Sequence, residues 1–221
     1  MNQLPFSVYD FFGYLASGAV LLASFVAAFF GEDAFENSPT LVLGFLLVIV
    51  IYALGQTVAN LAGELIEHRI VRRRLGTPTD ILLCFRHPEP SVSRWFPGYF
   101  RPLSPGVREQ VKERAGDRHG DDLFFHCHAR MKLVPVVQSR LETFIRLYGF
   151  CRNTALAMVI ASVFLGVGII LGTAGTGSVA GPGWWLVLAV IASVGLFYRY
   201  LKFYRQYGFE LFTSYAEAEF Q

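Results

Sequence analysis

The residues best suited to chemistry in this sequence are four polar side chains spaced four residues apart, Gln56, Asn60, Glu64 and His68. Because residues at this spacing lie on the same side of an α-helix, they predict one polar stripe. Its first two members fall in an apolar run, where an amide that faces lipid is costly and one that faces another helix or water is not. Two interpretations are open. The stripe forms hydrogen bonds between helices, or it lines a water-filled path, at an oligomer axis or between spans, in which Glu64 attracts cations.

A second group of potential ligands lies between His119 and His128 and contains three histidines, two aspartates and Cys127. His126 and His128 are two residues apart, so a helix would point them about 200° apart, and only an extended backbone would let both bind one metal ion. A helical turn would instead pair Asp122 with His126. We expect a helix here, with these residues acting mainly in packing and hydrogen bonding, and no metal or other cofactor.

The sequence lacks the motifs of three classes of membrane enzyme. Palmitoyl transferases with four spans also carry an insert between spans two and three, but their Asp-His-His-Cys tetrad and zinc cysteines are missing here. Rhomboid proteases need a Gly-x-Ser-Gly serine, whereas Ser17-Gly18 is preceded by Leu15-Ala16, and no histidine lies in an apolar run. The metalloprotease motif His-Glu-x-x-His is absent as well. We therefore expect that the protein is not an enzyme.

The composition is that of a membrane protein. Of the 221 residues, 53% are hydrophobic and only 16% are charged, and the mean hydropathy is +0.42. These values are too apolar for an ordinary soluble domain. All 19 Lys and Arg residues lie either between Arg69 and Arg152 or between Arg199 and Arg205. The positive-inside bias explains such a distribution, so we do not expect nucleic-acid binding, which combines basic residues with stacking aromatics.

Four apolar runs predict an all-α integral membrane protein with four transmembrane helices. About 20 apolar residues cross the hydrocarbon core of a bilayer, and runs that approach or reach this length cover residues 8–30, 41–62, 154–171 and 184–198. Small residues recur in the first run and beside the polar stripe, which lets helix backbones approach each other in lipid. They are Gly13, Ser17, Gly18, Ala19, Ala23 and Ala27, and then Gly55, Ala59 and Gly63. We expect close helix packing and a homo-oligomer.

The basic residues indicate the orientation of the chain. Arg69 and the block Arg72–Arg74 directly follow the second run, and such a block stays on the cytoplasmic side. The loops 31–40 and 172–183 contain no basic residue, which suits translocated connections. We therefore expect both termini in the cytoplasm and an inner-membrane location. All three cysteines fall on the cytoplasmic side, where disulfides are disfavoured.

The domain boundaries follow from these runs. Residues 1–62 should hold the first two membrane helices and residues 151–200 the last two. Between them, residues 63–150 should form a small α-rich cytoplasmic domain, and residues 201–221 should form a cytoplasmic helix. A domain of this size buries only a modest core, so we expect it to lean on the helices that enter and leave it. The acidic residues of the last segment, all expected to be exposed, are Glu210, Glu217 and Glu219.

Glycines and prolines divide the predicted cytoplasmic domain. The second membrane helix should continue to Leu75 and end at Gly76-Thr77-Pro78. Residues 87–105 contain prolines at five positions and predict a loop. Helices are then expected over 105–116, over 121–131, and from Val136 into the third membrane span.

Aromatic and basic residues near the predicted membrane surfaces are candidates for contact with lipid headgroups. The aromatics of the 87–105 loop need a packing surface, which is either the membrane interface or their own domain. The candidates are Arg72, Arg73, Arg74, Trp95, Arg101, Trp184 and Trp185. Asp10, at the start of the first helix, acts either as a solvated cap or as an ion or partner contact.

Two short segments resemble small uncharacterised bacterial membrane proteins with four spans. Residues 140–144 (Arg-Leu-Glu-Thr-Phe) and 148–153 (Tyr-Gly-Phe-Cys-Arg-Asn) are similar to the entry to their third span, and residues 9–14 (Tyr-Asp-Phe-Phe-Gly-Tyr) to their first span. The resemblance implies a membrane component of a bacterial defence island. We expect a gated pore or membrane-perturbing effector controlled by the cytoplasmic domain. The alternative is a non-conducting scaffold or sensor that recruits a soluble cytoplasmic partner.

Overall fold

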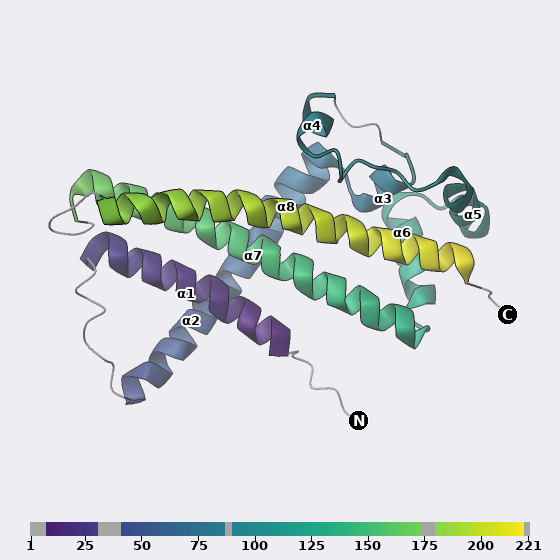
Figure 1. Ribbon diagram of the computed structural model, residues 1–221. Coiled ribbons are helices and arrows are strands. Elements are labelled where there is room, and N and C mark those ends of the chain that lie inside the picture. The colour runs from purple at the N-terminus through teal and green to yellow at the C-terminus, as the bar shows by residue number, and fades with distance from the viewer. Residues whose placement is uncertain (1–7, 31–40, 87–89, 174–179, 219–221) are drawn as a thin grey trace. The chain divides into compact units, whose positions relative to one another are not determined.

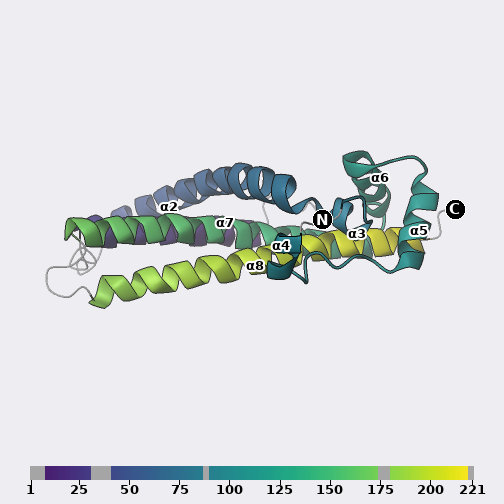
Figure 2. The same ribbon diagram turned by 90° about the horizontal axis from the view of Figure 1, so that it is seen from above.

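The structure, a computed structural model, describes residues 8–30, 41–86, 90–173 and 180–218, and every regular element in these ranges is a helix. Figure 1 and Figure 2 show the helices in two orientations. Four of them are long and apolar enough to cross a membrane: α1, α2 with its continuation η2, α7 and α8. The predictions of an all-helical chain and of four candidate membrane helices are confirmed. The predicted loop 31–40 and Glu219 lie outside the described residues.

The chain divides into two compact units. The first unit contains residues 1–66 and 149–197, and the second unit contains residues 67–148 and 198–221. The long helices are α1 (Val8–Phe30), α2 (Leu41–Ala62), α7 (Pro135–Leu171) and α8 (Ala180–Glu217). The apolar runs of the sequence correctly located α1 and α2, because a bilayer span leaves little freedom in length.

Two glycines bring the backbones of α1 and α2 into direct contact in the first unit. A methyl group added at Gly18 would overlap the backbone carbonyl of Ile51, and one added at Gly55 would overlap the backbone of Tyr14. Both glycines are buried. Lipid gives no hydrophobic drive between helices, so this close approach stabilises the pair through dispersion contacts. The packing role predicted for the small residues is confirmed at these two positions.

α7 packs against α1 near the C-terminal end of α1. A methyl group added at Gly168 would collide with the backbone of Ala28. The Thr173 hydroxyl donates to the Ala28 carbonyl oxygen over 2.8 Å, and the rings of Phe25 and Phe164 meet edge to face with centroids 5.7 Å apart. As at the contact between α1 and α2, a glycine lets the backbones of two helices approach closely.

Beyond Ala62 the second membrane helix changes its winding. Gly63–Leu75 form η2, a π-helix, in which each backbone N–H bonds the carbonyl five residues earlier. The series closes with the Gly76 N–H donating to the Val71 carbonyl over 2.9 Å. Gly76 has a φ of 87°, a conformation that favours glycine. The predicted end of the helix is therefore confirmed, and the π winding is a finding that the sequence did not indicate.

The second unit contains four shorter helices: α3 (Pro78–Leu82), α4 (Pro90–Trp95), α5 (Pro105–Ala115) and α6 (Gly120–Met131). Thr77 and Asp80 cap α3 reciprocally, each side chain bonding the backbone N–H of the other. The predicted bounds of α5, α6 and the start of α7 are correct to within one residue. The loop predicted over residues 87–105 is wrong in part, because α4 lies inside it.

The end of α8 completes the core of the second unit. Figure 2 shows this end beside α5, and the Arg114 guanidinium of α5 donates to the Tyr215 carbonyl over 3.2 Å. The Glu210 side chain is only 16% exposed, so its predicted full exposure is wrong. The buried core residues are Leu82, Leu83, Leu103, Val111, Ala115, Leu123, Cys127, Met131, Leu141, Tyr207, Leu211, Phe212, Tyr215 and Ala216.

Candidate functional site

The polar stripe of α2 divides into one half-buried residue and a set of exposed residues. Gln56 is half-buried, and its Nε2 donates to the Tyr52 hydroxyl over 3.0 Å. The Tyr52 ring lies against Phe11 and Tyr14 of α1, with centroids 5.4 and 5.8 Å apart. Gln56 therefore bonds a residue of its own helix, beside the α1 contact, and not a residue of another helix as the structural interpretation expected.

Asn60 and Glu64 lie on the exposed side of the same helix. The opposite side is buried against the rest of the first unit and consists of Gly55, Val58, Ala59, Ala62 and Ile66. Leu61 and Leu65, both exposed, border the two polar residues. Within one copy of the chain, Asn60 and Glu64 thus face outward from the α1 and α2 pair and do not line a path between these two helices.

Thr57 belongs to the exposed face, although the four-residue spacing did not select it. Its side chain is exposed, and its Oγ1 donates to the Ala53 carbonyl over 3.0 Å. The alternation of four-residue and three-residue steps that characterises an α-helix would have joined Thr57 to Asn60 and Glu64. His68 is also exposed and, like Glu64, lies in η2, but it belongs to the second unit, whereas Glu64 belongs to the first. The candidate site is therefore Thr57, Asn60 and Glu64.

A basic polar group lies at the start of the membrane part of α7. Asn153 and Thr154 are buried, and Nε and Nη2 of Arg152 each lie 3.2 Å from Asn153 Oδ1 and donate to it. A methyl group added at Gly63 would lie 3.8 Å from the Arg152 Nη1. Gly63 directly precedes Glu64, so the structure brings a guanidinium close to the acidic end of the candidate site. In the sequence, the polar triplet Arg-Asn-Thr at the start of an apolar run is the feature that could have indicated this group.

The potential ligands of α6 are packing residues in the described structure. The His126 ring meets the Tyr215 ring edge to face, and the His128 ring stacks on Phe124. Cys127 is fully buried in the core, and burial raises the pKa of its thiol to about 12. The thiol therefore stays protonated near neutral pH, whereas metals bind the thiolate.

The surroundings of the two histidines lower their pKa values. Burial lowers the pKa of His126 and His128, and the nearby Arg118 and Lys132 act in the same direction. The Asp122 carboxylate lies 3.9 Å from the Arg118 guanidinium, and it also interacts with His126, whose pKa it acts to raise, so the predicted pairing of Asp122 with His126 persists as an electrostatic interaction. Among the described residues, no group of three or more His, Cys, Asp or Glu is arranged to hold a metal ion.

The candidates for headgroup contact differ in their surroundings. The Arg72 guanidinium lies 3.7 Å from Asp121 and forms an ion pair within the second unit. The remaining candidates are exposed, and their contact with lipid stays a prediction. They are Arg73, Arg74, Trp95 and Arg101 in the second unit and Trp184 and Trp185 in the first.

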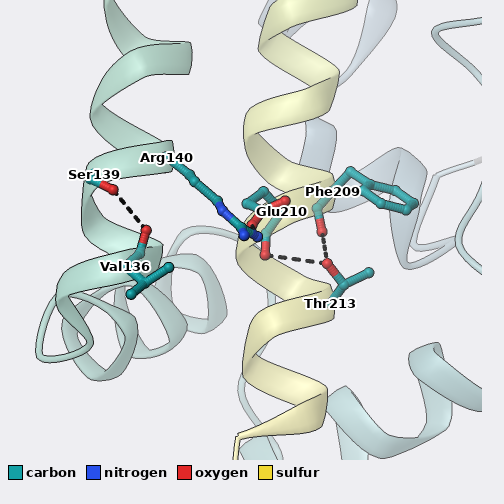
Figure 3. Close-up of polar contacts among 6 residues, drawn as sticks. All are labelled: Val136, Ser139, Arg140, Phe209, Glu210 and Thr213. Atoms are coloured by element: carbon teal, nitrogen blue, oxygen red, sulfur yellow. Dashed lines mark hydrogen bonds and ion pairs between the residues drawn. The ribbon is translucent and has the colours of Figure 1, made fainter.

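A polar contact joins α7 to α8 within the second unit (Figure 3). The Arg140 Nη1 donates to the Glu210 Oε1 over 3.0 Å. Thr213, one turn further along α8, donates its hydroxyl to the Phe209 carbonyl over 2.7 Å. The Glu210 side chain is mostly buried while the Arg140 side chain is mostly exposed, so the pair is screened by solvent from one side only.

We expect the Arg140–Glu210 pair to contribute about 0.5–1 kcal/mol to the stability of the second unit, the upper part of the range for partly exposed ion pairs. A double-mutant cycle with Arg140→Gln and Glu210→Gln measures this coupling in detergent. The matched control is the pair Glu142–Arg146 within α7, whose side chains are both more than one-third exposed. Its coupling should be smaller, about 0.3–0.5 kcal/mol. Equal couplings would show that the partial burial of Glu210 has no effect.

Comparison with protein-family models, with curated proteins and with solved structures finds no match to this chain.

Proposed function

We propose that the chain is a homo-oligomeric gated pore, or membrane-perturbing effector, of the bacterial inner membrane. In this proposal both termini are cytoplasmic, and the second unit is the cytoplasmic domain that controls the membrane helices. The exposed face of α2 and of the first turn of η2, which carries Thr57, Asn60 and Glu64, lines the water path. The resemblance to defence-island membrane proteins would assign this activity to antiphage defence.

The observation that carries the proposal is the exposure of Asn60 and Glu64 on a membrane helix. An amide or carboxylate that faces hydrocarbon is costly, and such groups in membrane helices usually face a protein partner or water. The buried side of α2 is already occupied by α1 through Gly18 and Gly55. The exposed side is therefore available to a second copy, and repeated copies around an axis would gather the carboxylates into a ring that attracts cations.

A second candidate function is a non-conducting scaffold or sensor. The second unit has its own buried core, which joins α3, α5 and α6 to the ends of α7 and α8. A folded domain of this kind offers a surface for a soluble cytoplasmic partner without any ion flux. In that case Asn60 and Glu64 would only form hydrogen bonds between helices of neighbouring copies.

Cysteine cross-linking in the membrane tests the assembly on which the proposal depends. We expect Asn60→Cys, in a chain whose native cysteines are replaced, to form disulfide-linked dimers on mild oxidation, because the exposed faces of neighbouring copies meet there. Ala59→Cys is the matched control, since Ala59 is adjacent in sequence and buried. Cross-linking at neither position, with the protein folded, would contradict an axis lined by α2.

A further inference from the structure

α4 is a helix of six residues, Pro90–Trp95, in which no residue is fully buried, and only Val92 and Ser93 are half-buried. Trp95, its last residue, is 71% exposed. A short helix without a buried face gains little stability from packing. A large exposed aromatic side chain at its end indicates a surface that lipid or another molecule covers.

The position of Trp95 is fixed by α8. The Tyr198 hydroxyl donates to the Trp95 carbonyl over 3.1 Å, and the rings of Phe96 and Tyr198 lie with centroids 5.0 Å apart. Tyr198 directly follows the apolar part of α8, and Arg199 is the first charged residue after it. Trp95 is therefore held beside the first residues that follow the apolar part of α8, although it is distant from them in the sequence.

The segment that follows Trp95 is held at two further points. The hydroxyl of Tyr99, a buried residue, donates to the Gly76 carbonyl at the end of η2 over 2.9 Å. The Arg205 guanidinium of α8 donates twice to the Arg101 carbonyl, over 2.8 and 3.2 Å. The exposed placement of Trp95 is thus a built feature of the second unit and not the result of a loosely held loop.

The charge of this segment matches an anionic surface. Residues 90–104 contain two arginines, Arg94 and Arg101, and no acidic residue. Both side chains are exposed, as is that of Arg199. Basic residues beside the end of a membrane helix attract anionic lipid headgroups, and tryptophan is enriched at the same depth.

We propose that α4 is an interfacial anchor. Trp95 inserts at the headgroup level of the bilayer that α8 crosses, and Arg94 contacts the phosphates of anionic lipids. Tyr198 positions the anchor by holding the Trp95 backbone. This inference does not depend on whether the protein conducts ions, because it needs only the contacts within the second unit and a bilayer that α8 crosses.

Tryptophan fluorescence in lipid nanodiscs tests the anchor. In a Trp184→Phe, Trp185→Phe chain, Trp95 is the sole tryptophan. We expect its emission to be quenched by lipids brominated near the headgroup end of the acyl chain and protected from iodide in the water. Arg94→Gln should lower the equilibrium between the bilayer-inserted and water-exposed states of Trp95 about fivefold, the factor given by about 1 kcal/mol per arginine near an anionic surface. Discs of neutral lipid should lower it further, because Arg101 and Arg199 then lose their attraction as well.

Two further variants keep the test interpretable. If the double tryptophan variant does not fold, the difference between wild type and Trp95→Phe gives the same signal. Tyr198→Phe removes the hydroxyl that holds Trp95 and keeps the ring, so it should reduce lipid quenching while the protein remains folded. Full iodide quenching with no effect of brominated lipid would overturn the anchor and leave α4 as a docking surface for a protein. Equal lipid quenching in neutral and anionic discs would overturn the role of Arg94.

Discussion

Gly55→Ala should destabilise the first unit by about 1–3 kcal/mol, the range for overpacking in a close-packed interior. The added methyl group would overlap the backbone of Tyr14. A backbone cannot move aside as a side chain can, so α1 and α2 have to separate along the contact. Separation also removes the dispersion contacts that hold membrane helices together. The expected loss is therefore large for the smallest possible change of side chain.

The same helix contains a matched control. A methyl group added at Gly44 would meet no described atom within 4 Å. Gly44→Ala should therefore change the stability by no more than about 0.5 kcal/mol, as is usual for surface substitutions. Unfolding by titration with a denaturing detergent compares the two variants. Equal midpoints for Gly55→Ala and Gly44→Ala would show that the close α1 and α2 contact does not contribute to stability.

Gly18→Ala should act like Gly55→Ala, because its methyl group would overlap the Ile51 carbonyl on the same interface. The double variant should lose less than the sum of the single losses, because helices separated by the first substitution already have room for the second. This non-additivity would distinguish one shared interface from two independent sites.

The sequence predicted the membrane helices well because their length and composition are set by the bilayer. It also predicted the ends of the shorter helices where glycine and proline act locally, as at Gly76 and Pro105. It did not show which glycines meet which backbones. That pairing depends on the crossing of two helices, and small residues recur at many positions of α1.

Two features of the fold depend on contacts between distant residues, which local patterns do not contain, and a third is a local winding. α4 lies in a proline-rich segment and is held by Tyr198, about one hundred residues later in the chain. Glu210 has a charged partner in Arg140 across two helices. The π winding of η2 follows from its hydrogen-bond pattern, which the residue types do not specify.

The candidate site was predicted in part. Four-residue spacing correctly joined Asn60 to Glu64, but an α-helix advances 3.6 residues per turn, so a stripe extended by fours drifts around the helix. Gln56 therefore turns toward Tyr52 and the α1 contact, while Thr57 takes its place on the exposed face. Gln56 and Thr57 are adjacent in the sequence, but Gln56 is half-buried and Thr57 is exposed, and this difference is seen only in the packed structure.

The largest functional effect is expected from Asn60→Leu in the reconstituted protein. If the exposed face lines a water path, an apolar side chain at its narrow point favours dewetting, and ion flux into liposomes should be lost while the oligomer persists. Glu64→Gln removes a charge and keeps the shape. It should lower cation flux at least about fivefold, because each carboxylate of the ring acts on an ion at about 4 Å with about 1 kcal/mol in water.

Gln56→Leu provides the contrast for both variants, because it makes the same amide-to-leucine change at a residue bonded to Tyr52. It should lower thermal stability in detergent by about 0.5–1.5 kcal/mol, as for one lost intramolecular hydrogen bond, and leave the flux unchanged. The scaffold interpretation predicts a different pattern, in which Asn60→Leu also costs only stability and the wild type carries no flux. Flux in the wild type that survives Asn60→Leu would contradict the assignment of α2 as the pore lining, since the leucine would then stand where water has to pass.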